Sequence, residues 1–232
     1  MPSRTPPRSH EPSSTLPLFP LPHLLTYPGR LLPLHIFEAR YRALMRDVLD
    51  GDRRFAMAVL RPGWEPEYEG RPPIYAPVTV GRVSKYRELP DGRFVLHLRG
   101  ESRARVLEES GGRPYRIGRL ELIAEEPLDS TKAAELRPEI EGVLRDYCGK
   151  VALPPMPECD GDAEPPAICP VLIADEALLS IPIPMERKLE IFSTPCQATR
   201  VRAVIEVLRG LLNRRIEISR CERLTPQNLS MN

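Results

Sequence analysis

The sequence predicts an α+β protein: a β-rich first half, forming a small, mostly antiparallel barrel or half-barrel with one early helix, and then a helical bundle. Nine of the 28 prolines fall in the first 33 residues, and from residue 195 onward only Pro195 and Pro226 occur. Because a proline costs about 3 kcal/mol inside a helix, long helices are favoured only near the C-terminal end. Alternating apolar residues between 55 and 125, and helical apolar spacing after Pro127, support the same division.

The composition bounds the class of protein. The 232 residues are 41% hydrophobic with a net charge of +1, which suits one large domain or two small ones and commits to no partner. No apolar run approaches the roughly 20 residues of a membrane span, and the polar N-terminus is not a secretory signal. Five scattered cysteines without a C-x-x-C pair argue against a zinc site or a disulfide framework. We therefore expect a soluble cytoplasmic protein that holds no metal and no cofactor.

The N-terminal segments are expected to be extended. Residues 1–14 are predicted to be a disordered leader, followed at Leu16–Leu21 by an edge strand that tolerates its prolines. Leu31–Phe37 predicts a second extended run, and about Glu38 to Leu49 predicts the first helix. The apolar face of that helix is spaced at i, i+3, i+4 and i+7: Tyr41, Leu44, Met45 and Val48.

The region up to residue 127 is predicted to complete a β domain that spans residues 15–127. Phe55–Leu60 is a continuous apolar run, typical of a central strand, and residues 61–73 form an irregular loop. Leu89–Arg93 predicts a turn that uses glycine for a positive φ, and Gly100 predicts a bulge or bend. The strands assigned around these features are Val78–Val83, residues 94–99, residues 103–106 and Tyr115–Leu122.

Residues 128–218 are predicted to form a helical bundle, with a tail at 219–232. In its first helix Pro138 either introduces a kink or opens the main part. A proline-rich loop follows at 152–170, and then two short helices and a long one. The long helix is expected to begin with a cap at Thr194, proline at its first position and Gln197 at its third.

Catalytic motifs are missing from the sequence, which predicts no catalytic residues. There is no phosphate-cradling glycine loop followed by Lys and Ser or Thr, no G-x-S-x-G elbow and no H-E-x-x-H. A cysteine hydrolase would need Cys148 or Cys196 to meet His35 or His97, and the helical core spacing around both cysteines disfavours it.

The loop from Trp64 to Tyr75 is the first candidate binding feature. It holds the only tryptophan of the chain together with Tyr68 and Tyr75. Aromatic side chains on a long loop are typical anchors for a peptide or protein partner. The equal alternative is that they fold back over the mouth of the barrel.

The second candidate is basic. Residues 81–119 hold ten Lys or Arg against five Asp or Glu. On alternating strands Arg93, His97 and Arg99 are expected to share a face, as are Arg103 and Arg105. This pattern is typical of a solvated outer sheet face. The alternative function that it supports is an RNA- or nucleotide-binding surface formed by Arg93, Arg99, Arg103 and Arg105.

A family resemblance extends from Leu16 to Glu126. Leu16–Leu21 (L-P-L-F-P-L) and Leu32–Tyr41 (L-P-L-H-I-F-E-A-R-Y) together resemble the N-terminal domain of Lon proteases. Further matching segments are Asp52–Phe55, Val80-Gly81, Leu89–Arg93 and Gly100–Arg105, with a less distinctive helical match around Ile181–Lys188.

The resemblance implies a PUA-like pseudo-barrel followed by a helical bundle. In full-length Lon proteases this region helps to engage substrate proteins. The ATPase and Ser-Lys protease motifs of Lon are missing here, so the resemblance implies a stand-alone, non-catalytic Lon substrate-binding-domain protein. The expected partners are unfolded or exposed apolar polypeptide segments, with a protease or chaperone as a further candidate.

Overall fold

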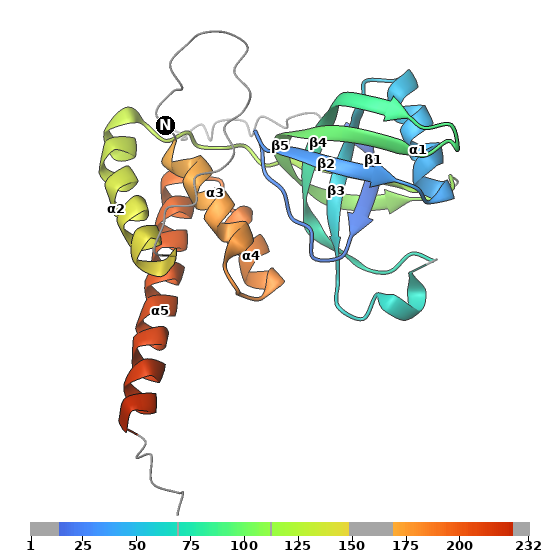
Figure 1. Ribbon diagram of the computed structural model, residues 1–232. Helices are drawn as coiled ribbons and strands as arrows, with labels where there is room; N and C mark the ends of the chain where they lie inside the picture. Colours follow the sequence, from blue (N-terminus) through green and yellow to red (C-terminus); the bar gives the residue numbers. More distant parts are fainter. Residues whose placement is uncertain (1–13, 69, 112, 149–168, 225–232) are drawn as a thin grey trace, which may run out of the picture. The chain divides into compact units, whose positions relative to one another are not determined.

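The computed structural model consists of two compact units, Met1–Ala124 and Glu125–Asn232 (Figure 1). Residues 1–13 of the predicted leader and nearly all of the proline-rich loop at 152–170 lie outside the described residues, whereas Ser14, predicted as the last leader residue, is the first residue of the first strand. The backbone is described for residues 14–68, 70–111, 113–148 and 169–224, and the side chains of that set up to residue 215.

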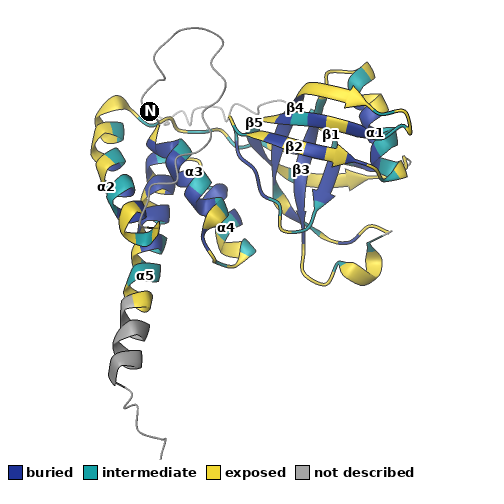
Figure 2. Ribbon diagram, in the orientation of Figure 1, coloured by how far each residue is buried: buried dark blue, intermediate teal, exposed yellow. Residues whose placement is uncertain are grey.

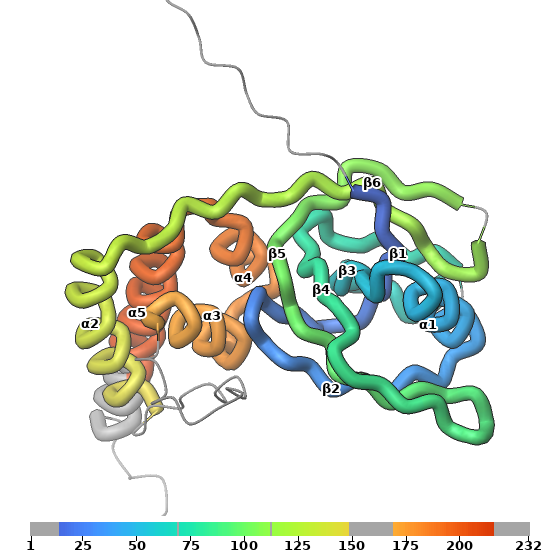
Figure 3. The backbone as a smooth tube through the Cα atoms, turned by 90° about the horizontal axis from the view of Figure 1, so that it is seen from above, coloured from blue at the N-terminus to red at the C-terminus, as the bar shows by residue number. Residues whose placement is uncertain are grey.

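The first unit is a closed barrel (Figure 3). Five strands form the ring in the order β5–β4–β3–β1–β6, and β6 pairs back onto β5. β2 pairs with the first part of β5, residues 94–99, along the edge opposite β4, and among the described strands only the β1–β3 pair is parallel. The elements of the first unit, in chain order, are β1 (Ser14–Leu21), β2 (Leu31–Ile36), α1 (Ala39–Asp50), β3 (Arg54–Leu60), the short 3-10 helix η1 (Glu65–Glu67), β4 (Ile74–Glu88), β5 (Phe94–Ser110) and β6 (Arg116–Leu122).

The first strand is not an edge strand, contrary to the sequence prediction. The N-terminal half of β1 pairs with β6 and its C-terminal half pairs with β3, and the two ladders share Leu18. Pro17 therefore lies opposite Ile117 on one side, and Pro20 lies opposite Ala58 on the other. Each half of β1 is hydrogen-bonded to a neighbouring strand along one side only. A proline, which has no N–H, can therefore occupy either half without the loss of an inter-strand hydrogen bond.

A bulge in β5 divides the apolar residues between two cores. Val80 pairs with Ser102 and Gly81 pairs with Gly100, so Glu101 is the extra residue and the predicted irregularity at Gly100 is confirmed. One extra residue reverses the face to which alternate side chains point. One core, from all five ring strands, is Leu16, Leu18, Ala56, Ala58, Val78, Val80, Ala104 and Leu120. The other joins β2 and the first half of β5 to the predicted face of α1 (Figure 2).

The second unit is helical, as predicted. It contains α2 (Ser130–Cys148), α3 (Pro170–Ser180), α4 (Met185–Phe192) and α5 (Gln197–Leu224). Pro138 lies inside α2, so it does not open that helix. α5 continues to Leu224 and therefore includes the first residues of the segment predicted as a tail from 219.

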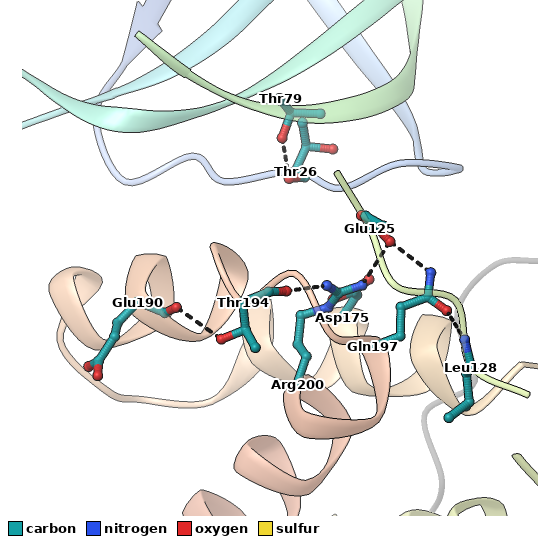
Figure 4. A network of polar contacts seen from close by, with 9 residues as sticks. All are labelled: Thr26, Thr79, Glu125, Leu128, Asp175, Glu190, Thr194, Gln197 and Arg200. Atoms are coloured by element: carbon teal, nitrogen blue, oxygen red, sulfur yellow. Dashed lines mark hydrogen bonds and ion pairs between the residues drawn. The ribbon is translucent and has the colours of Figure 1, made fainter. Parts of the chain in front are cut away.

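The start of α5 differs from the predicted capping box (Figure 4). The helix begins at Gln197, and the Thr194 hydroxyl donates backward to the Glu190 carbonyl at 3.4 Å instead of capping it. The Gln197 side chain accepts the Leu128 N–H at 2.9 Å and donates to Glu125 at 2.7 Å. Gln197, which the sequence predicts as part of a local cap, therefore connects the segment before α2 to the start of α5.

Candidate functional site

A cavity of about 210 Å³ in the barrel unit brings together side chains from five separate segments of the chain. These segments are the end of β1 and of β3, the first turn of α1, the loop before β4, and the turn that enters β6. Three lining residues are tyrosines and four are arginines, both of which are enriched at binding hot spots. The lining residues are Pro20, Arg40, Tyr41, Leu60, Tyr68, Gly70, Arg71, Pro72, Arg113, Pro114, Tyr115 and Arg116.

Glu38, just before α1, organises one wall of this pocket. Its Oε1 accepts a hydrogen bond from the Tyr68 hydroxyl at 2.5 Å, and its Oε2 accepts one from Arg40 Nε at 2.9 Å. Arg40 also donates to the Tyr68 carbonyl at 2.9 Å, with its guanidinium 4.7 Å from the Tyr68 ring centroid. These contacts fasten the loop after η1 to the first turn of α1.

A second wall is built around Asp47 from the last turn of α1. The Tyr115 hydroxyl donates to Asp47 Oδ2 at 2.5 Å, and Arg113 forms an ion pair with the same carboxylate. Arg113 Nη1 also donates to the Tyr115 hydroxyl at 2.9 Å. The turn that enters β6 is thereby held against α1.

Arg116 is the most enclosed arginine of the pocket. Its Nε and Nη2 donate to the two carboxylate oxygens of Glu109 at 2.6 and 2.8 Å, and its Nη1 donates to the Pro72 carbonyl at 2.6 Å. The side chain is 10% exposed. Arg71 contrasts with it, because this exposed residue has a single hydrogen bond among the described residues, a 3.4 Å contact to the Ser110 carbonyl.

The three tyrosines of the pocket are neutral phenols at ordinary pH. Burial raises the pKa of Tyr68, and the hydrogen bond to Glu38 raises it further. Burial also raises the pKa of Tyr115, assisted by the hydrogen bond to Asp47. Burial raises the pKa of Tyr41 as well. The pocket therefore offers a ligand apolar ring faces beside cationic guanidinium groups.

The structure separates the three aromatic residues singled out from the sequence. Tyr68 lines the pocket, and half-buried Trp64 packs against it edge-on with 5.2 Å between ring centroids. Tyr75 lies in β4 and is only 9% exposed, with the guanidinium of Arg61 5.2 Å from its ring centroid. Two of the three aromatics thus belong to the pocket region, whereas Tyr75 is a buried residue of β4 that does not line it.

The four arginines of the alternative nucleic-acid surface are not gathered into one exposed patch. Arg93 forms an ion pair with Asp91, and Arg103 is only 2% exposed. Arg99 and Arg105 are exposed, but they lie on opposite sides of the β5 bulge and so on opposite faces of the strand. The bulge at Glu101, next to the Gly100 position where the sequence predicted an irregularity, separates them.

Sequence reasoning missed most of the cationic lining. Glu38, Arg40 and Tyr41 belong to the quoted L-P-L-H-I-F-E-A-R-Y segment, but their apparent role was to start a helix. Arg71, Arg113 and Arg116 carry no motif, because the closure of the barrel brings them to the pocket from distant segments.

The described residues contain no group of three or more His, Cys, Asp or Glu side chains arranged to hold a metal ion. Among the helices of residues 14–224, none is long and apolar enough to cross a bilayer. Cys148 and Cys196 lie in the helical unit, whereas His35 and His97 lie in the barrel.

The fold and the pocket together define an α+β domain in which a closed barrel with a binding-type cavity precedes a helical bundle. The chain belongs to the family of ATP-dependent protease La (Lon) substrate-binding domains, whose profile matches residues 15–210. The barrel-plus-bundle architecture inferred from the sequence is confirmed by the six-stranded sheet, the helical unit and the solved relatives.

Curated relatives and solved structures agree with this family. The chain is 26% identical to the Lon protease of Anaeromyxobacter dehalogenans and 27% identical to Lon protease 2 of Myxococcus xanthus, over 88% of its own length. It spans about a quarter of the length of these relatives, 24% in each. A Lon N-terminal domain protein from Xanthomonas campestris has the same fold, with a TM-score of 0.57 and 21% identity, covering 83% of this chain and 98% of that one. A Mycobacterium avium complex Lon N-terminal domain gives 0.55 at 15% identity, covering 84% and 98%.

Proposed function

We propose that this chain is a non-catalytic module that binds segments of unfolded or exposed apolar polypeptide through the barrel pocket. The observation that carries the proposal is the pocket lining, in which tyrosine rings and guanidinium groups are presented together by segments fastened to α1. Membership of a substrate-binding-domain family supports it. The likeness to proteins called Lon protease makes protein substrates the natural ligand class.

Tyr68 and Trp64 are the proposed anchors. Tyr68 has its hydroxyl tied to Glu38 and its backbone tied to Arg40, so the ring is held in place before any ligand arrives. A ring that is already ordered loses little conformational entropy on binding, which favours affinity. Trp64 supports Tyr68 from the side and widens the aromatic surface.

The test is capture of a permanently unfolded, fluorescently labelled polypeptide by the full chain, followed by anisotropy. Tyr68→Ala should weaken binding about tenfold, the effect of losing one hot spot of about 1.4 kcal/mol. Tyr86→Ala is the matched control, because Tyr86 is 46% exposed and does not line the pocket. Binding that is absent in the unmodified protein, or equal in the two variants, would reject the proposal. The polypeptide should stay uncleaved during the measurement.

A further inference from the structure

We infer that the pocket selects a polypeptide residue by its carboxylate group, supplied either by the end of a chain or by an acidic side chain. The inference rests on the proposed function and adds the chemistry that the pocket would recognise. It depends on three properties of the cavity: its size, its charge and the hydrogen-bond donors that remain available in it.

The size of the cavity limits the ligand to about one residue. Sites for drug-sized ligands and cofactors occupy about 300–1,000 Å³. The present cavity, at about 210 Å³, falls below that range. A polypeptide would therefore place a single residue inside, with the rest of the chain on the surface around it.

The charges around the cavity favour an anion. Four guanidinium groups line it, and the described carboxylates that pair with them are Glu38, Asp47 and Glu109. Arg71 has no carboxylate partner among the described residues, which do not include Glu69. The described groups leave one positive charge in excess beside aromatic walls, where the reduced dielectric strengthens attraction to an anion.

The available donors are concentrated on two arginines. All three nitrogens of Arg116 donate to Glu109 or a backbone carbonyl. In Arg40, Nε and Nη1 donate to Glu38 and a backbone carbonyl, and Nη2 forms an ion pair with Glu38 at 2.8 Å. Arg113 uses only Nη1, and Arg71 uses only Nη1 in its long contact to Ser110. Within the described residues, Nε and Nη2 of Arg71 and Arg113 remain open. An arginine with two adjacent open N–H groups matches a carboxylate in bidentate geometry.

Arg71 and Arg113 both line the pocket and both border the β5–β6 turn. Arg71 reaches the β5–β6 turn, where its guanidinium lies 3.4 Å from the position that a Cβ on Gly111 would occupy. Arg113 follows Gly111 by two residues in the same turn. A carboxylate beside this turn would contact both groups, while the rest of its residue lies against Tyr68 and Tyr115.

The test titrates the full chain with labelled octapeptides that share one sequence of uncharged residues ending in leucine and differ only in their carboxylate groups. One has a free C-terminal carboxylate, a second has a C-terminal amide, and a third is an amide with one internal aspartate. The free acid, the aspartate peptide or both should bind about tenfold more tightly than the neutral amide, as expected for one charge-assisted contact. Whichever of the two acidic peptides carries the advantage identifies the source of the carboxylate.

Variants test whether Arg71 and Arg113 cause the higher affinity of the acidic peptides. Arg71→Gln and Arg113→Gln should each reduce it, Arg71→Lys should restore part of it, and Arg87→Gln, an exposed arginine of β4 away from the pocket, should leave it unchanged. Unchanged melting temperatures will show that the glutamine variants are folded.

Two outcomes overturn the inference while the proposed function stands. In the first, all three peptides bind equally and Tyr68→Ala weakens each of them. In the second, no peptide binds, but the protein still captures unfolded polypeptide through Tyr68. Loss of all polypeptide capture by the unmodified protein rejects the proposed function itself, so the two failures are distinguishable.

Discussion

Glu38 shows how a residue that looks like the start of a helix can organise a binding pocket. It occupies the position before α1, where an acidic side chain commonly caps the helix, yet it makes no capping hydrogen bond. Both of its oxygens are instead committed to Tyr68 and Arg40. The sequence segment thus combines a structural and a site-building function, and only the structural one could be predicted.

Replacing Tyr68 by phenylalanine should measure the contribution of this contact to stability. The variant loses a hydrogen bond to a charged carboxylate, worth about 1.5–3 kcal/mol when fully buried. Because Tyr68 is partly exposed, we expect the free energy of unfolding to fall by about 1 kcal/mol in urea titrations. Tyr86→Phe should leave stability unchanged, and an equal loss in both variants would contradict the assigned role of Glu38.

The raised pKa values of Tyr68 and Tyr115 predict a loss of stability at alkaline pH. The folded protein holds these protons to higher pH than the unfolded chain, so their contribution is complete below the unfolded value of about 10. It is lost as the pH rises through the raised folded values. Urea titrations between about pH 9 and 11 should show a shallower decline for the Tyr68→Phe, Tyr115→Phe double variant than for the unmodified protein. Parallel declines would exclude this origin.

At the scale of elements, the β5 bulge determines which side chains can act together. It lies beside Gly100, whose N–H and C=O pair with Arg30 and Gly29 of the crossing segment, residues 22–30, which connects β1 to β2. A Cβ on Gly100 would lie 2.2 Å from the Tyr27 carbonyl oxygen, so the two backbones touch here. The turn glycine Gly92 has φ of +75°, as predicted from its sequence.

Gly100→Ala should therefore be among the most harmful single-methyl additions to the barrel. Relieving the clash requires backbone movement, for which we expect a loss of about 1–3 kcal/mol. The control is Gly210→Ala in α5, where the added methyl meets nothing within 4 Å and the helix gains up to about 1 kcal/mol. Denaturant unfolding of both variants checks the prediction, and a harmless Gly100→Ala would mean that the crossing segment moves freely.

The start of α5 depends on a buried ion pair. Arg200 and Asp175 are 0% and 3% exposed, with Nε and Oδ1 3.2 Å apart outside hydrogen-bond geometry. Arg200 also donates to the Thr194 carbonyl at 2.8 Å and forms an ion pair with Glu125 at 3.4 Å (Figure 4). Removing one member of such a pair leaves a buried charge without compensation.

Arg200→Met should accordingly lower the free energy of unfolding by about 3–5 kcal/mol. Arg202→Met, on the exposed side of the same helix, should change it by less than about 0.5 kcal/mol. The Arg200→Met, Asp175→Asn double variant should lose less than the sum of the two single losses, since the residues interact directly. Additive losses would show that the pair is not coupled.

For the molecule as a whole, local patterns predicted the elements and failed wherever the fold depends on distant segments. The periodicity of Tyr41, Leu44, Met45 and Val48 identifies the buried face of α1 because it is a property of one helix. The interior position of β1 could not be read in the same way, since it requires β6 about 95 residues later. The pocket is hidden for the same reason: Arg116 becomes a neighbour of Pro72 only when the ring closes.

The barrel unit should fold without the helical unit. It contains its own two cores, all six strands and every lining residue of the pocket. A fragment of residues 14–124 is therefore expected to unfold in one cooperative transition and to retain Tyr68-dependent polypeptide binding. A fragment that melts without cooperativity, or that folds but no longer binds, would place part of the function elsewhere in the chain.

The position of β1 between β3 and β6 also has a consequence for synthesis. The first strand leaves the ribosome early, but its antiparallel partner follows about 95 residues later, an interval of roughly 5–20 s at ordinary elongation rates. Throughout that interval the apolar L-P-L-F-P-L segment is translated but cannot complete its ladders. Ribosome-arrested chains should become protease-resistant only after β6 has emerged, so the nascent protein itself exposes for seconds the kind of segment that chaperones bind.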